Sequence, residues 1–196
     1  MEAMNETLWC VDVEGNGASP PEMVELAMVE WSLTEIRTRH FSWLIKPNKS
    51  ISNAVSRIHG ITDADVIDAP TTEDIADDVL RWLNDRAIVG HNVRVEVETL
   101  RRAFPDWQPT GAIDTLTLAK RLKPGLASYG LGALGETFGL SSEAASRTGQ
   151  HHHSALYDAT LAGLLLSHLL QNLSESEQAK ALLDADFLNP SQGQLL

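Results

Sequence analysis

The stretch LWCVDV, Leu8–Val13, is a short apolar run that is interrupted by a single carboxylate at Asp12. A run of this length predicts a buried central strand of a β-sheet. The glycines and prolines between positions 15 and 21 then indicate a turn. Two more strands are predicted over Met23–Leu33 and His40–Lys46, and they are expected to form an antiparallel meander with the first strand.

The rest of the chain alternates predicted helices with short strands. Apolar residues recur at helical spacing between Thr72 and Leu83, which predicts an amphipathic helix. Three strands followed by this alternation indicate an α/β fold, in which helices flank a mixed β-sheet of three antiparallel strands and two further strands. The further strands are expected at Ala87–Val89 and Ala112–Ile113, and the further helices at Ile51–Ile58, Asn92–Phe104 with Asn92 as the N-cap, Thr115–Leu122, Tyr129–Phe138, Ser154–Leu170 and Glu175–Leu183.

The composition is that of one soluble globular domain. The chain has 196 residues, of which 43% are hydrophobic and 21% are charged, and this length can bury a full core. Apolar runs stay well short of the roughly 20 residues that span a bilayer, and the N-terminus lacks the pattern of a secretory signal. The single Cys10 cannot form an internal disulfide, which suits a reducing cytoplasm. We expect the main domain at residues 1–170, with residues 171–196 adding a helix and a tail to it.

The formal net charge of −12 argues against a protein that coats nucleic acid, because such proteins neutralise phosphates with basic residues. Carboxylates have another use, since they gather metal cations, and the bound cations then carry the positive charge that meets a phosphate. The charge therefore disfavours non-specific duplex binding and leaves open an enzyme that acts on one strand end.

Asp12 and Glu14 are the first candidate metal ligands. Residues two apart on a strand point to the same face of the sheet, so both carboxylates are expected to project together. Two adjacent acids at the end of a buried strand repel each other and resist desolvation, and a bound cation removes both costs. From these residues alone, a frayed strand end with two solvated acids is the alternative.

Asp158 lies in the apolar stretch SALYDATLAGLLL, Ser154–Leu166. A helix that is apolar nearly all round is buried, and a buried carboxylate needs a compensating partner. That partner is a metal ion, a basic side chain or a helix terminus, and the helix alone does not select among them.

His153 stands just ahead of Ser154, a predicted N-cap, so its ring is free to turn toward the acids. A histidine with a pKa near neutrality suits general-base catalysis beside a metal-bound water. For the run His151–His153 the alternatives are a solvated loop and an adventitious transition-metal site. Because oxygen ligands dominate the candidate set, Mg²⁺ or Mn²⁺ is favoured over zinc.

Helix geometry selects Glu96 as the fourth acid. At about 100° per residue, Glu96 falls at the edge of the apolar face of its helix. Glu98 falls on the opposite side near Arg94, where it is expected to be a solvated ion-pair partner. A salt-bridged surface position remains the alternative for Glu96.

These segments together resemble the DEDDh (DnaQ-like) family of 3′-5′ exonucleases, over residues 8–170. VDVEGNG (Val11–Gly17) is similar to the first family motif, VGHNVRVE (Val89–Glu96) to the second and HSALYD (His153–Asp158) to the third. IHGIT (Ile58–Thr62) and IDTLTLAKRL (Ile113–Leu122) also look like family segments, and HHHSALYDA is especially similar to the exonuclease X branch, next to the proofreading epsilon-type subunits.

The resemblance implies a ribonuclease H-like fold and a two-metal hydrolysis of phosphodiester bonds. It implies that His153 activates water as the general base and that two divalent cations, Mg²⁺ or Mn²⁺, are bound. The family usually has an aspartate where this chain has Glu96, and the extra methylene changes the reach of that carboxylate. The implied metal ligands are Asp12, Glu14, Glu96 and Asp158.

Substrate contacts follow only by analogy with the family. They are expected from Asn16, Gly17, His59 and Asn92. For His59 the alternative is an interaction with the last carbonyls of its own helix.

Three functions remain open from the sequence. The favoured one is a metal-dependent 3′-5′ exonuclease acting on DNA ends, in repair or proofreading. The second is an oligoribonuclease-like or RNA-trimming exonuclease with the same site. The third is a catalytically weakened module that binds nucleic acid or a protein. A single-stranded DNA or RNA 3′ end is the implied substrate, and a polymerase or other protein partner and a homodimer are the further expectations.

Overall fold

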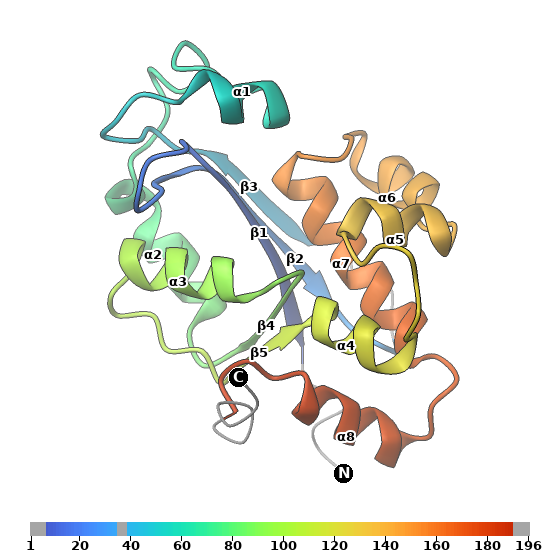
Figure 1. Cartoon of the computed structure of the whole chain (residues 1–196). Helices are drawn as coiled ribbons and strands as arrows, with labels where there is room; N and C mark the ends of the chain where they lie inside the picture. The colour runs from blue at the N-terminus through green and yellow to red at the C-terminus, as the bar shows by residue number, and fades with distance from the viewer. Residues whose placement is uncertain (1–6, 35–38, 190–196) are drawn as a thin grey trace.

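The computed structural model describes residues 7–34 and 39–189, so residues 190–196 of the predicted tail lie outside it. Within these residues, five strands form one mixed sheet in the order β3-β2-β1-β4-β5 (Figure 1). The antiparallel part consists of β1 (Leu8–Gly15), β2 (Met23–Trp31) and β3 (His40–Leu44), and β4 (Ala87–Gly90) and β5 (Gly111–Asp114) run parallel to β1. The predicted mixed sheet with flanking helices is confirmed.

Helices cover both faces of this sheet (Figure 1). The apolar helix α7 (Ala155–Leu170) packs on one face together with α4 (Thr115–Leu122), α5 (Leu131–Thr137) and α6 (Ser141–Thr148). On the other face lie α2 (Thr72–Leu83) and α3 (Arg94–Ala103), and the short α1 (Asn53–His59) and the late α8 (Glu175–Asp184) complete the fold. Across the described ranges, none of the helices combines the length and hydrophobicity that a bilayer crossing requires.

The alternation of side chains along β1 decides which way its acids point. Leu8 and Cys10 belong to the core cluster under α7, whereas Trp9 and Val11 belong to the cluster under α2 and α3. Since the side-chain period of a strand is two residues, positions 12 and 14 continue the face that α7 covers. The core beneath α7 therefore ends in two carboxylates at the C-terminal end of β1.

One local prediction was wrong, and one helix was not predicted. Asn92 does not cap α3, because that helix begins after Val93 without a side-chain cap among the described residues. Asn92 instead has a left-handed backbone, with φ 65°, and its N–H donates to Asp114 Oδ1 at 2.8 Å. The same Asp114 oxygen accepts the N–H of Val93 at 3.4 Å, so a carboxylate of β5 fixes the backbone just before α3. Helix α6 was not predicted, since SSEAASRT has no apolar stripe and buries only Ala144.

The segment after α7 returns to the sheet. Asp186 forms an isolated bridge with Ile113 of β5, and its Oδ1 accepts the N–H of Ala112 at 2.8 Å. The N–H of Asp114 donates to the carbonyl of Ala185 at 2.9 Å. The described part of the C-terminal segment thus covers the β5 edge of the same sheet.

Candidate active site

Three acids from β1 and α7 meet where β1 ends. Asp12, Glu14 and Asp158 each offer one oxygen atom, and these atoms lie within 4.8 Å of one another. Asp158 stands in the first turn of α7 and is buried, with 5% of its surface exposed. The predicted common face of Asp12 and Glu14 is confirmed, and the buried helix brings its only acid to the same point.

Glu96 reaches this place from the other helical layer. It is 4% exposed, and its Oε2 has no hydrogen-bond partner within the described residues. A Cβ atom at Gly90 would lie 3.3 Å from this oxygen, so the glycine at the end of β4 leaves the carboxylate its room. Glu98, by contrast, is half-exposed and pairs with Arg94 at 2.7 Å. The predicted division between an inward Glu96 and a solvated Glu98 is confirmed.

The acids shift one another's protonation. Burial and the neighbouring Glu96, Asp158, Glu14 and Glu25 carboxylates raise the pKa of Asp12 well above its usual value. Burial, together with Asp158 and Glu25, raises the pKa of Glu14 to about 7. Burial, aided by Asp114 and Glu14, raises the pKa of Glu96 to about 8. The charged groups that shift these three pKa values are all carboxylates, so the cluster has a strong excess of negative charge.

A divalent cation fits this arrangement. Hard cations such as Mg²⁺ and Mn²⁺ take carboxylate oxygens as ligands, and the cluster offers several oxygens at ligand separations. A buried carboxylate oxygen without a partner, such as Glu96 Oε2, carries a desolvation cost that a cation would offset. The donor set and the unpaired oxygen both match a cation site.

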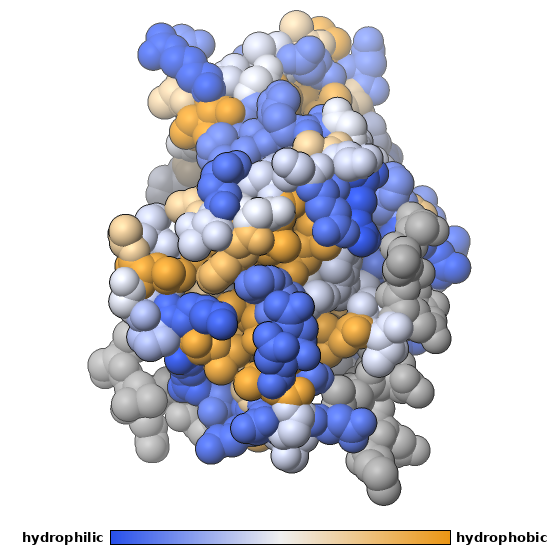
Figure 2. All heavy atoms as spheres, turned by 90° about the vertical axis from the view of Figure 1, so that its right-hand side faces the viewer, coloured by the Kyte–Doolittle hydropathy of each residue, from blue (hydrophilic) through white to orange (hydrophobic). Residues whose placement is uncertain are grey.

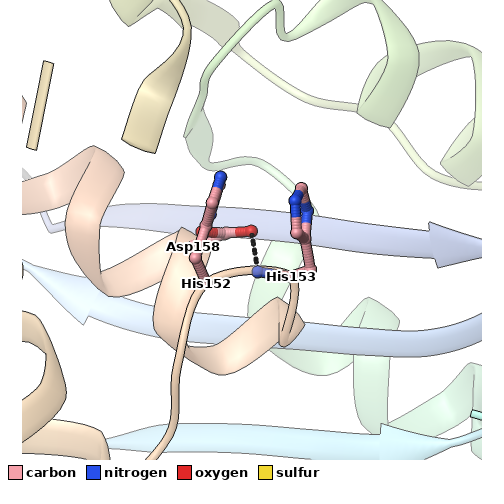
Figure 3. A group of neighbouring side chains, drawn as sticks. All are labelled: His152, His153 and Asp158. Atoms are coloured by element: carbon pink, nitrogen blue, oxygen red, sulfur yellow. Dashed lines mark hydrogen bonds and ion pairs between the residues drawn. The ribbon is translucent and has the colours of Figure 1, made fainter. Parts of the chain in front are cut away.

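Asp158 has two partners of its own (Figure 3). Its Oδ1 lies 2.6 Å from His152 Nδ1, and its Oδ2 accepts the backbone N–H of His153 at 3.0 Å. His153 stands before the helix with φ 68°, and its ring stacks on that of His152 with centroids 3.9 Å apart. Burial, and then the charge of His152, lowers the pKa of His153. The sequence analysis did not single out His152 as a partner of Asp158. The run of three histidines was the feature that could have pointed to it.

Glu25 is a further acid that the sequence did not reveal. It lies opposite Glu14 in the β1–β2 register, and its Oε2 accepts the N–H of Ala155, the first residue of α7, at 2.9 Å. Burial raises the pKa of Glu25, and this hydrogen bond opposes the shift. Ser154 makes no side-chain cap bond in the described structure, so Glu25 supplies an acceptor at this helix terminus. A carboxylate inside the apolar run MVELAMV was the available signal.

The residues expected near a substrate fall into two groups. Gly17 and His59 line a mostly apolar cavity of about 220 Å³ that also contains Glu14. The His59 ring faces the carbonyl of Gly15 at 3.3 Å rather than the carbonyls of its own helix. Asn16 is fully buried, and its amide holds the turn by contacts to Ala18, Glu22 and Lys49. Asn92 is exposed and does not line the cavity.

A larger cavity lies apart from these acids. The side of the molecule that shows α4–α7 carries a central band of hydrophobic residues between hydrophilic ones (Figure 2). A cavity of about 610 Å³ is lined by Trp31 of β2, by residues of α6 such as Arg147, and by the C-terminal half of α7. None of the four candidate acids lines this cavity, so the larger cavity is not the candidate active site.

Comparisons with known proteins show which family the sequence matches. The family model RNase_T, described as Exonuclease, matches residues 9–166. DNA polymerase III subunit epsilon of Aquifex aeolicus (strain VF5) is 28% identical over 176 residues, which cover 87% of this chain and 83% of that protein. The PolC-type DNA polymerase III of Oceanobacillus iheyensis is 32% identical over 178 residues, but this chain spans only 12% of its length.

Solved structures with a similar fold are also exonucleases. Exonuclease X in complex with 5′ overhanging duplex DNA is 30% identical, with a TM-score of 0.72, and the match covers 89% of this chain and 99% of that one. The nuclease domain of 3′hExo, a DEDDh family member bound to rAMP, shares the fold at 17% identity, with a TM-score of 0.70 and coverage of 89% and 96%. The expected ribonuclease H-like fold is thereby confirmed. The chain belongs to the RNase_T exonuclease family, the DnaQ-like group that its motifs indicated.

Proposed function

We propose that this chain is a 3′-5′ exonuclease that removes nucleotides from DNA 3′ ends with two divalent cations, Mg²⁺ or Mn²⁺. The observation that carries the proposal is the meeting of Asp12, Glu14 and Asp158. Glu96 is near enough to raise the pKa of Asp12, its Oε2 is buried and unpaired, and His153 donates its backbone N–H to Asp158. We propose DNA as the substrate, and not RNA, because two of the similar proteins are named as DNA polymerase III components and a third is an exonuclease whose structure was solved with DNA.

In this mechanism the four acids hold the cations. When bound, the cations supply Lewis-acid stabilisation of the phosphate and make water easier to deprotonate. His153 accepts the proton of the attacking water at a ring nitrogen, because its lowered pKa keeps the ring neutral at pH 7. The water oxygen bonds to phosphorus as the bond from phosphorus to the 3′ oxygen breaks. The 3′ oxygen takes up a proton and stays on the shortened strand as its terminal hydroxyl, and the nucleoside 5′-monophosphate is released.

The apolar cavity beside Glu14 suits the terminal base. Val13, Val55, Ile58 and Val95 line it with Gly17 and His59, and Ile58 and Val95 are large hydrophobics that remain about half-exposed. An apolar side chain that faces solvent next to an acidic cluster is suited to contact the face of a nucleobase. We propose that His59 also contacts the terminal nucleotide in this cavity. Asn16 would affect substrate binding indirectly, by holding the turn after β1. Asn92 would do so through its backbone, which is held by Asp114.

The direct test is an assay on matched oligonucleotides. Single-stranded DNA, single-stranded RNA and dinucleotides, each labelled at the 5′ end, are incubated with the full chain and Mg²⁺ or Mn²⁺. We expect the 5′-labelled DNA to shorten one nucleotide at a time from its 3′ end. A second DNA sample, labelled at its 3′-terminal nucleotide instead, should release the label as the mononucleotide in the first step. Faster cleavage of RNA or of dinucleotides would favour the oligoribonuclease-like alternative. An absence of cleavage under all conditions would contradict the proposal.

A second expected result concerns stability and pH. Glu14 and Glu96 have raised pKa values, about 7 and about 8, so the folded chain binds these protons more tightly than the unfolded chain does. Without cations, stability should therefore fall as pH rises from about 5 through 8. Bound Mn²⁺ should remove this fall, because it compensates the deprotonated acids. At about 2–4 °C per kcal/mol for a domain of this size, the effect on Tm should be several degrees.

Melting curves with EDTA or with saturating Mn²⁺ measure this effect across the pH range. The matched variants are Glu96→Gln, which should flatten the pH dependence in EDTA, and Glu98→Gln, which should leave it as in the wild type, since Glu98 is half-exposed and paired with Arg94. Equal pH dependence with and without Mn²⁺ would count against a cation site at these acids.

Partners and domain limits remain part of the proposal. The names of two relatives support a polymerase as a protein partner, and co-purification with a polymerase subunit would test it.

We also propose that residues 1–170 form the exonuclease domain and that residues 171–196 belong to it as an accessory segment. The contacts of Asp186 with β5 support this assignment.

A further inference from the structure

The cluster of His152, His153 and Asp158 offers ligands of another kind than the carboxylate site. One nitrogen of each ring and one oxygen of Asp158 lie within 4.8 Å of one another (Figure 3). Imidazole nitrogens suit zinc, whereas a set made only of carboxylates suits Mg²⁺ or Mn²⁺. We propose that these three residues form a second metal site, which binds Zn²⁺ and inhibits the enzyme.

Turning of the two histidine rings, which now stack with centroids 3.9 Å apart, would bring one nitrogen of each toward a common ion. Zinc bonds of 2.0–2.2 Å to nitrogen and oxygen imply ligand separations of about 3.4 Å in a tetrahedral site. The His152 Nδ1 and Asp158 Oδ1 atoms, now 2.6 Å apart, would separate by less than about 1 Å to reach that value. The His152 side chain is 41% exposed, and both histidines precede the first residue of α7. Their rings can therefore turn while the helix stays in place.

Helix α5 leaves the space that the His152 ring occupies. A Cβ atom at Gly132, in α5, would lie 2.8 Å from His152 Nε2. A side chain at position 132 would therefore push the His152 ring out of its present place over Asp158. The space for His152 comes from α5, and the carboxylate that the ring contacts comes from α7, so the cluster is more than an exposed run of histidines.

Inhibition follows from the residues that the two sites share, and this part rests on the proposed function. Asp158 would be a ligand in both sites, so Zn²⁺ and Mg²⁺ compete for it. A His153 ring bound to Zn²⁺ has lost the lone pair with which it would accept the proton of water. Zn²⁺ should therefore inhibit Mg²⁺-dependent cleavage, and more Mg²⁺ should be needed to restore it.

The test uses the full chain and two measurements. Zn²⁺ is titrated calorimetrically into the protein in the presence of Mg²⁺ and without nucleic acid, and Zn²⁺ inhibition curves are recorded on a labelled DNA oligonucleotide. The variants are His152→Ala, and Gly132→Ala, which displaces the same ring without removing it. The matched control is His151→Ala, because His151 is an exposed imidazole of the same loop that lies outside the cluster. Each variant's activity without Zn²⁺ is its own reference.

We expect His152→Ala and Gly132→Ala to bind Zn²⁺ at least about tenfold more weakly than the wild type, as for the loss of a supporting group in a metal site. Half-inhibition should require a similarly larger Zn²⁺ concentration, and His151→Ala should behave as the wild type. Unchanged Zn²⁺ affinity in His152→Ala, or an equal loss in His151→Ala, would overturn the proposal. If the chain cleaves no nucleic acid at all, the proposed function fails, and the calorimetry still decides whether the zinc site exists.

Discussion

Replacing His153 with alanine is expected to lower kcat on single-stranded DNA by about 10²–10⁴-fold, the usual contribution of a general base. The KM for the oligonucleotide should change little, because the apolar cavity beside Glu14 that is proposed to hold the base includes His59 and not His153. Cation binding should persist, since the carboxylate oxygens of Asp12, Glu14 and Asp158 cluster without help from the ring. Initial rates with saturating Mg²⁺ measure the effect.

His151→Ala is the control for this experiment. The His151 ring is exposed, and its Nδ1 lies 3.0 Å from the carbonyl oxygen of the neighbouring His152. Its removal should leave kcat within about twofold of the wild type, in the range of a surface substitution. A His153→Ala enzyme that retained nearly full activity would show that another group accepts the proton.

Replacing Glu96 with glutamine is expected to lower Mg²⁺-dependent activity by about 10²-fold or more. A neutral amide is a weaker ligand for Mg²⁺ than a carboxylate, and an ion that is bound out of place costs about this factor in rate. The substitution keeps the size of the side chain and removes one negative charge from the acidic cluster. Because burial and neighbouring acids raise the pKa of Glu96 to about 8, the neutral amide should also raise the stability of the cation-free protein. Loss of activity with a gain in Tm would separate a ligand from a structural residue.

The matched substitution is Glu98→Gln, two residues along the same helix. Glu98 lies on the exposed side in an ion pair with Arg94, and exposed pairs contribute at most about 1 kcal/mol. Activity should therefore stay close to that of the wild type. If both variants were equally active, the fourth acid would have to be sought elsewhere. Glu25, which raises the pKa of Asp12, and Asp114, which raises the pKa of Glu96, would be the next candidates.

The parts of the site that depend on periodicity could be predicted from the sequence. The two-residue repeat of β1 placed Asp12 and Glu14 on one face, and the apolar surroundings of Asp158 required its burial. The helical repeat distinguished Glu96 from Glu98 in the same way. Each of these inferences concerns one element and the direction of its side chains, and local sequence determines that direction.

The parts that depend on contacts between elements could not be predicted. Glu25 accepts a hydrogen bond from Ala155, Asp114 accepts one from the N–H of Asn92, and the His152 ring lies next to Gly132. In each case the partners are brought together only by the packing of separate segments. The wrong assignment of Asn92 as an N-cap has the same origin, since the carboxylate that holds the Asn92 backbone lies on β5.

Glu96 and Asp158 belong to helices on opposite sides of the sheet, and this origin has a mechanical consequence. An ion held by both would act as a removable cross-link between the two layers, closed only while the metal is present. Chelation would then release the first turn of α3 and the entry to α7 as a single cooperative unit. Amide hydrogen exchange in these two distant segments should quicken together, to the same extent and at the same metal concentration.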